Sequence, residues 1–302
     1  MARIANPIYD AAFKYLMDSP RVAQVLIAAI LEIPKSNILE VIPDRNDIIT
    51  GKRDGINVCR LDYCVKIRTK ENIKTVYIEL QKAVGKGEIA RFRKYLAAQY
   101  NRKSNVDKDK NPLPIIPVYI LGDKIKELTE SVSYIKRSYF KQKNIPYKED
   151  VSNDFTECLS HDMIVIQIPR LNPRPDSTLD NILTIFDQNN KDKKKKQVVY
   201  YDIDDYDIPK GELREDMRYM VRRLEEASVS DDVLMEMDLE DKAEELINER
   251  KKAFDLLNES QKELQEKNNQ LQESQKELQK KDNQLQESKK ELKIGNNFVI
   301  LN

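Results

Sequence analysis

Two runs of sequence form the centre of this protein: Asn57-Val58-Cys59-Arg60-Leu61-Asp62-Tyr63-Cys64-Val65-Lys66-Ile67 and Lys74-Thr75-Val76-Tyr77-Ile78-Glu79-Leu80-Gln81-Lys82. In both runs apolar and polar side chains alternate, which is the pattern of a half-buried β-strand. The residues between them, 68–72, have turn composition, so the sequence predicts an antiparallel hairpin. The alternation puts Asp62 and Glu79 on the face opposite the apolar side chains. Closing the hairpin is expected to bring the two acids together.

Asp62 and Glu79 form a pair of carboxylates that suits a divalent cation. Mg²⁺ takes one or two carboxylates, keeps several waters and leaves positions for phosphate oxygens. Hydrolysis of a phosphodiester is the chemistry that such a site supports. Spacing alone leaves an alternative open, because charged side chains are usually exposed. In that alternative both acids are solvated residues on the outer face of an ordinary hairpin.

Three short motifs follow one another along the chain: Asp10-Ala11-Ala12-Phe13-Lys14-Tyr15-Leu16, then Asp62 with Ile78-Glu79-Leu80-Gln81, then Arg91-Phe92-Arg93-Lys94-Tyr95. This series resembles the PD-(D/E)xK nucleases, and more narrowly the recombination-promoting nuclease and transposase-like family of that superfamily. The resemblance covers residues 3–190. It implies a restriction-endonuclease-like fold and a Mg²⁺-dependent DNA endonuclease, a hydrolase that acts in DNA recombination or transposition.

The resemblance also implies roles for individual residues. Asp62, Glu79 and the backbone carbonyl of Leu80 would ligate Mg²⁺, or Mn²⁺ in its place. Gln81 stands where the wider superfamily has a lysine that orients the attacking water; its amide can position water but brings no positive charge and accepts no proton near neutral pH. Asp10 is a candidate accessory ligand. Its alternative role is that of a first-turn acid favoured by the helix dipole.

A basic segment follows the hairpin. Residues 82–103 contain seven basic residues and one acid, which favours docking of a phosphate backbone. We expect a helix over residues 88–101 whose core stripe is Ile89, Phe92 and Leu96. The candidate DNA-binding residues on this helix are Arg91, Arg93 and Lys94. Solvated surface charge is the alternative explanation of the patch.

Further patterns predict an α/β core. Apolar runs indicate strands at 38–43, 118–121, 131–135 and 163–169, so that the hairpin becomes part of a mixed sheet of about five strands flanked by helices. Residues 6–32 have helical spacing, and Ser19-Pro20 should divide them into two helices. The overall fold class is therefore α/β.

Cysteine and histidine usage argues against other chemistries. Cys59, Cys64 and Cys158 show no CxxC spacing, and His161 is the single histidine. We therefore expect neither a disulfide nor a zinc site. A catalytic pair of Cys158 and His161 lacks an identifiable third member and oxyanion site.

Composition divides the chain into five segments. These are a nuclease-like domain at 1–190, a basic linker at 191–199, an acidic helical arm at 200–257, a coiled coil at 258–294 and a tail at 295–302. The basic linker is an exposed loop that could also touch a phosphate backbone. The acidic arm suggests a hypothesis in which it folds back as a mimic of DNA and restrains activity.

The predicted coiled coil carries a fourteen-residue repeat. Glu259-Ser260-Gln261-Lys262-Glu263-Leu264 returns at 273–278 and, with one substitution, at 287–292. Leucines recur at every seventh residue from Leu257 to Leu292, whereas after Phe254 the other seam position is polar. Such a coil is weak, because polar seam residues cost stability while they specify register. We expect a long helix that ends at Gly295 and supports a homo-oligomer; a single helix stabilised by Glu/Lys pairs is the alternative.

Charge and hydropathy restrict how the protein can attract DNA and whether it can enter a membrane. The 302 residues include 52 basic and 52 acidic side chains, so attraction to DNA must come from uneven distribution of charge. No run approaches the roughly twenty apolar residues of a membrane span, and the start lacks a secretory signal pattern. We expect a cytoplasmic protein that does not enter membranes. Two alternatives to the nuclease stay open: a catalytically inactive DNA-binding protein of the same fold, and an oligomeric coiled-coil scaffold.

Overall fold

The computed structural model describes residues 1–43, 52–53, 56–57, 63–69, 73–81, 86–149, 151, 153–172, 174–192 and 194–299. The chain divides into two compact units, Met1–Glu240 and Asp241–Asn302. The first unit contains the sheet and the candidate site. The second consists of the distal part of one long helix.

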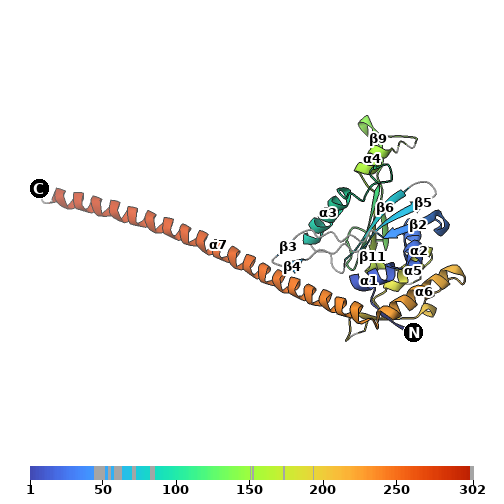
Figure 1. Cartoon of the computed structure of the whole chain (residues 1–302). Helices are drawn as coiled ribbons and strands as arrows, with labels where there is room; N and C mark the ends of the chain where they lie inside the picture. The colour runs from blue at the N-terminus through green and yellow to red at the C-terminus, as the bar shows by residue number, and fades with distance from the viewer. Residues whose placement is uncertain are drawn as a thin grey trace. The chain divides into compact units, whose positions relative to one another are not determined.

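A six-stranded mixed sheet forms the centre of the first unit (Figure 1). Its strands, in spatial order, are β2 (Ile38–Pro43), β5 (Tyr63–Thr69), β6 (Ile73–Gln81), β7 (Ile115–Leu121), β11 (Met163–Gln167) and β8 (Val132–Ile135). β6, β7 and β11 run parallel, whereas β5 and β8 pair antiparallel with their neighbours. β7 and β11 are almost continuously apolar, as expected for strands covered on both faces, whereas β6 alternates apolar and polar residues. The predicted mixed sheet is confirmed, with six strands instead of about five.

The helices α1 (Asp10–Met17), α2 (Pro20–Ile30) and α5 (Thr178–Leu183) cover one face of this sheet (Figure 1). The helix α6 (Glu212–Ala227) packs against α1 and α2. Pro20 stands in the first turn of α2, where its missing N–H costs nothing, so the predicted break at Ser19-Pro20 is confirmed. The helix α3 (Lys86–Tyr100) lies on the opposite face.

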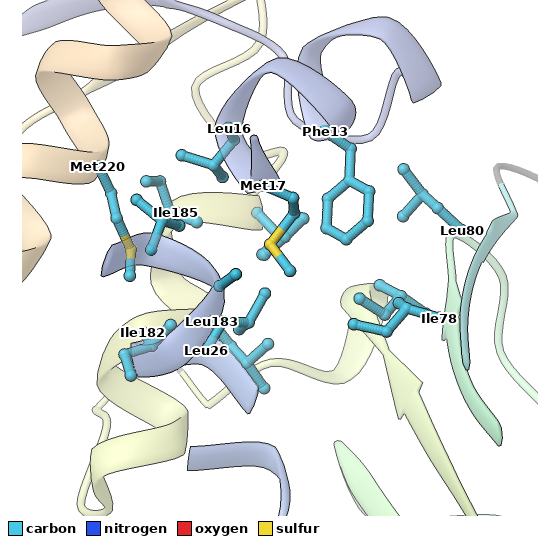
Figure 2. Close-up of a cluster of buried hydrophobic side chains, with 14 of the residues drawn as sticks. Phe13, Leu16, Met17, Leu26, Ile78, Leu80, Ile182, Leu183, Ile185 and Met220 are labelled. Carbon is cyan, nitrogen blue, oxygen red and sulfur yellow. The ribbon is translucent and has the colours of Figure 1, made fainter. Parts of the chain in front are cut away.

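The main core is formed by the sheet and the helices α1, α2, α5 and α6. Figure 2 shows Phe13 of α1 directed toward Ile78 and Leu80 of β6. Phe13 is fully buried and its ring packs edge-on against Tyr63, with 6.3 Å between the ring centroids. Each fully buried side chain of this size stabilises the fold by about 1.5–3 kcal/mol. The core therefore holds β5 and β6 firmly against α1.

Residues 191–240 belong to the first unit. β12 (Val198–Tyr201) pairs with β1 (Ala2–Ala5), and the core contains Met217, Met220 and Leu224 of α6. Buried Asp216 accepts hydrogen bonds from Arg21 (2.7 Å) and Lys35 (2.8 Å), which tie α6 to α2 and its C-terminal end. The observed division after Glu240 thus differs from the predicted domain end at 190 and from the predicted arm at 200–257. The apolar helical stripe of that arm is part of the main core as far as Met237, whereas Leu239, Leu246, Phe254 and Leu257 are exposed.

The helix α7 (Asp231–Val299) connects the two units. Its first turns supply Val233 and Met237 to the main core. The predicted long C-terminal helix is confirmed, but it runs through Gly295 and ends at Val299. The predicted end at Gly295 is therefore wrong: an interior glycine costs a helix only about 1 kcal/mol. Among the described residues, no helix combines the length and apolar character that crossing a bilayer requires.

Candidate functional site

The β5–β6 hairpin has the predicted antiparallel register. Tyr63 lies opposite Ile78 and Cys64 lies opposite Tyr77. Val76, Ile78 and Leu80 of β6 belong to the main core, as the alternation predicts. The intervening odd-numbered residues of β6 face α3. The two faces of one strand are therefore different environments, one apolar and one containing Glu79.

Glu79 is buried in spite of its charge. Only 1% of its surface is exposed, because β6 lies between two strands and beneath α3. The hydroxyl of Tyr77 donates a hydrogen bond to Glu79 Oε2. A buried carboxylate needs such donors, since leaving water without them is costly. The solvated-surface alternative is thus wrong for Glu79.

Tyr119 of β7 lies beside Glu79 in the parallel register. Burial, and then the neighbouring negative charge of Glu79, raise the pKa of Tyr119 from 10.0 to about 12. The phenol therefore stays protonated at neutral pH. Its ring packs against Phe92 of α3, with 5.1 Å between the centroids. The acid thus lies beside two tyrosines, and a helix residue, Phe92, covers one of them.

The buried stripe of α3 differs from the predicted one. Phe92, Tyr95 and Gln99 face the sheet, whereas Ile89 is exposed. The predicted core position of Ile89 is therefore wrong. Tyr95 packs on Tyr77 and Ile115, so the stripe is rotated toward the tyrosines of the sheet. A prediction from hydropathy places apolar residues in the buried stripe. It therefore misses a tyrosine and a glutamine that are buried against a polar face of the sheet.

The candidate DNA-binding residues lie on the outer side of α3. Arg93 and Lys94 are exposed, on the side away from the buried stripe. Arg91 belongs to the described backbone of α3, but its side chain lies outside the described residues. Arg93 and Lys94 thus have the exposure that contact with a phosphate backbone requires.

Leu80 and Gln81 end β6 at the carboxyl edge of the parallel strands. The Leu80 side chain is buried in the main core, and Gln81 is half-buried. The carbonyl of Gln81 accepts a hydrogen bond from the Gly122 N–H at 2.7 Å, on the β7 side. Successive carbonyls of a strand point to opposite sides, so that of Leu80 points toward β5. The carboxyl edge of a parallel sheet is where ligands usually bind.

Asp10 is the first residue of α1 and forms an ion pair with Lys14, at 2.9 Å between Oδ2 and Nζ. Its position matches the alternative role of a first-turn acid favoured by the helix dipole. The N–H groups of Asp10 and Ala11 donate to the carboxylate of Glu240, at 3.0 and 2.9 Å. Sequence reasoning missed this cap, because 230 residues separate Asp10 from Glu240 and no local pattern signals it.

Asp62 lies outside the described residues. Within the described part of the chain, no group of three or more His, Cys, Asp or Glu side chains is arranged to hold a metal ion. Of the predicted ligands, Glu79 and Leu80 lie within the described residues, as consecutive residues of β6. Tyr77 and Tyr119 are additional residues of the site. Strand alternation could have identified Tyr77, because it precedes Glu79 by two residues and so lies on the same face. Tyr119 could not be identified in this way, because its position beside Glu79 depends on the pairing of β6 with β7.

Cys158 and His161 bind different partners. The Cys158 thiol lies 3.2 Å from the carbonyl of Pro112. His161 Nδ1 forms a hydrogen bond of 2.8 Å with the hydroxyl of Tyr100 at the end of α3. Burial, followed by the positive charge of Arg137, lowers the pKa of His161. His161 thus joins α3 to the segment before β11.

Tyr119 provides a test of this electrostatic environment. An unfolded tyrosine ionises near pH 10, whereas folded Tyr119 does so near pH 12. Stability from this group is therefore complete below pH 10 and is lost as the pH rises toward 12. Between pH 10 and 11 we expect the free energy of unfolding to decline less steeply in Tyr119→Phe than in the intact protein. The two slopes should differ by up to about 1.4 kcal/mol per pH unit. Urea denaturation at several pH values measures this, and parallel declines in the two proteins would contradict it.

In comparisons with known proteins, the chain matches no family model, no curated protein and no solved structure.

Proposed function

We propose that this protein is a metal-dependent DNA endonuclease with a restriction-endonuclease-like core. The observation that carries the proposal is the burial of Glu79, which lies near the carboxyl edge of a central strand and accepts a hydrogen bond from Tyr77. A buried carboxylate offers little to folding, because its desolvation costs as much as its hydrogen bonds return. Such groups are typical of functional sites.

Asp62 is the proposed partner of Glu79. The described ladder between β5 and β6 reaches Tyr63 and Ile78. The residue before Tyr63 is Asp62 and the residue after Ile78 is Glu79. The order of residues therefore supports a pairing of these two acids at the same edge.

The available donors suit Mg²⁺ or Mn²⁺. Asp62, Glu79 and the Leu80 carbonyl would hold the ion through hard oxygen atoms, and Asp10 remains a proposed accessory residue. When bound, such an ion lowers the pKa of a coordinated water and stabilises charge on the phosphate. The hydroxyl of Tyr77 donates a hydrogen bond to Glu79 Oε2, which restricts the rotamer of the carboxylate.

Gln81 is the proposed positioning residue for water. It follows Glu79 by two residues on the same face of β6, at the strand end. Its amide can both donate and accept hydrogen bonds but cannot remove a proton at neutral pH. Arg91, Arg93 and Lys94 of α3 would bind the DNA backbone.

Conversion of supercoiled plasmid to nicked and linear forms tests the proposal. The intact protein should cut with Mg²⁺ or Mn²⁺ and should not cut with EDTA. Salt-dependent binding without cutting in either metal would overturn the nuclease and favour the inactive DNA-binding protein. Absence of both binding and cutting would favour the scaffold.

The second unit is proposed to form a homo-oligomer. Leu264, Leu271 and Leu278 are 58–64% exposed at seven-residue intervals along α7. Such a row of apolar side chains is covered when a second copy of the helix packs against it.

The double substitution Leu271→Lys/Leu278→Lys tests the proposed oligomer. Because each buried leucine contributes about 1.5–3 kcal/mol, we expect the dissociation constant to rise more than about 100-fold. Sedimentation velocity measures this. Asn269→Lys/Gln270→Lys adds the same charge at outward positions of the heptad and should leave the association unchanged. A monomeric intact chain would refute the proposal.

A further inference from the structure

A small basic hairpin extends from the first unit at the end of β8. It consists of β9 (Phe140–Lys141) and β10 (Ile145–Pro146), and it lies beside α4 (Asp154–Leu159) in Figure 1. Phe140 is 54% exposed, Ile145 55% and Tyr147 43%. Three large exposed side chains on one short hairpin form an apolar patch, and such patches mark interaction sites.

The hairpin is basic. Residues 131–148 contain Lys136, Arg137, Lys141, Lys143 and Lys148 and no acidic residue, and Glu149 follows directly. Arg137 is neutralised by Glu157 and Asp162, at 2.8 and 2.9 Å. The lysines remain as a cluster of positive charge around the exposed rings, which complements a polyanion.

The base of the hairpin is fixed whereas its tip is presented to solvent. Arg137 also donates to the carbonyls of Thr156 and Ser160, each at 3.1 Å, and Tyr139 binds the side chains of Thr156 and Glu157. At the tip, Lys143 and Asn144 adopt positive φ angles of 66° and 57°. These contacts hold the projecting turn in one orientation.

From these observations we propose that the β9–β10 hairpin binds an unpaired stretch of DNA. Phe140 stacks on a base, while Lys141, Lys143 and Lys148 contact the phosphates on either side. An aromatic ring surrounded by cations is the usual arrangement for single strands, since every base has a stacking face. This inference rests on the proposed function in taking DNA as the ligand, and it adds preference for a substrate with single-stranded character.

The position of α3 connects the hairpin to the candidate site. α3 begins after the carboxyl edge of β6, where Gln81 lies, and ends at Tyr100. Tyr100 binds His161, and the adjacent Asp162 binds Arg137 at the hairpin base. α3 therefore extends from the sheet edge that carries Gln81 to the residues that hold the hairpin base, with Arg93 and Lys94 exposed along it. A strand held at the hairpin can continue along α3 toward the sheet edge at Gln81.

A tryptophan introduced in place of Phe140 gives a direct test, because the intact chain contains no tryptophan. Oligo(dT) is added to the full-length Phe140→Trp variant in EDTA, so that cleavage plays no part. We expect quenching of the tryptophan fluorescence as a base stacks on the ring, and little quenching with blunt duplex of equal length. Phe254→Trp on α7 is the control and should not respond. Unchanged fluorescence of the Phe140→Trp variant would overturn the inference.

Affinity measurements complete the test. Phe140→Ala should weaken oligo(dT) binding by about 5- to 150-fold and blunt-duplex binding far less, whereas Phe140→Trp should retain affinity. The triple variant Lys141→Gln/Lys143→Gln/Lys148→Gln should lower the salt slope by about 2, at about 0.7 per phosphate contact. Lys262→Gln/Lys276→Gln/Lys280→Gln changes three exposed lysines of α7 and should leave the salt slope unaltered. Equal losses in both triple variants would overturn the inference.

The two proposals can fail separately. Plasmid cutting together with hairpin variants that bind like the intact protein would remove the hairpin contact and leave the nuclease. If the intact protein never cuts DNA but the hairpin variants bind DNA more weakly, the nuclease is removed and the hairpin contact stays.

Discussion

Glu79→Gln abolishes metal-dependent cutting of plasmid, with an expected fall in rate of at least about 100-fold. Loss of residues that only support metal ligands already costs about 10- to 100-fold, and a ligand should cost more. Glutamine keeps the shape and the hydrogen bond from Tyr77 but removes the charge that binds the ion. Initial rates of plasmid nicking at saturating Mg²⁺, and metal affinity by calorimetry, measure the effect. Asp62→Asn should behave in the same way.

Asp216→Asn is the matched control for Glu79→Gln. It also removes one charge from a buried carboxylate, here one bound to Arg21 and Lys35. This substitution should lower stability and leave cutting per folded molecule unchanged. Cutting by Glu79→Gln at the rate of the intact protein would show that Glu79 is only a buried structural acid.

Ending the chain before α6, after Gly211, should prevent folding of the first unit. The truncation removes Met217, Met220, Leu224 and Met237, all at most 2% exposed. At about 1.5–3 kcal/mol for each side chain, the loss is about 6–12 kcal/mol, comparable with the entire stability of a domain. Loss of the cooperative thermal transition, followed by circular dichroism, measures this result.

A chain that ends after Glu240 is the matched comparison. It retains these side chains and the Glu240 carboxylate on the α1 N–H groups, so it should unfold cooperatively. Equal unfolding behaviour of the two truncated chains would contradict the assignment of α6 to the core. The same reasoning affects the hypothesis that the acidic segment restrains activity, because deleting residues 200–302 removes part of the core. Charge reversal at exposed acids of α6 is a cleaner test of that hypothesis.

Sequence patterns predicted the strands better than the helix packing. The alternation of apolar and polar residues predicted β5 and β6, because a strand with one apolar face can only turn that face toward the core. The same logic failed for α3, where the expected Ile89 is exposed and Tyr95 is buried. Tyrosine suits either environment, so hydropathy alone could not decide which side of α3 faces the polar side of the sheet.

The local sequence determined three secondary-structure features of this protein. These are the hairpin with Glu79 and Gln81 on one face, the break at Ser19-Pro20 and the long C-terminal helix. These depend on side-chain periodicity and backbone chemistry within a few residues. Only the tertiary structure decided that Glu79 is buried beside Tyr119, that Glu240 caps α1 and that α6 completes the core. Each of these depends on contacts between distant segments, and such contacts follow from the packing of the whole unit.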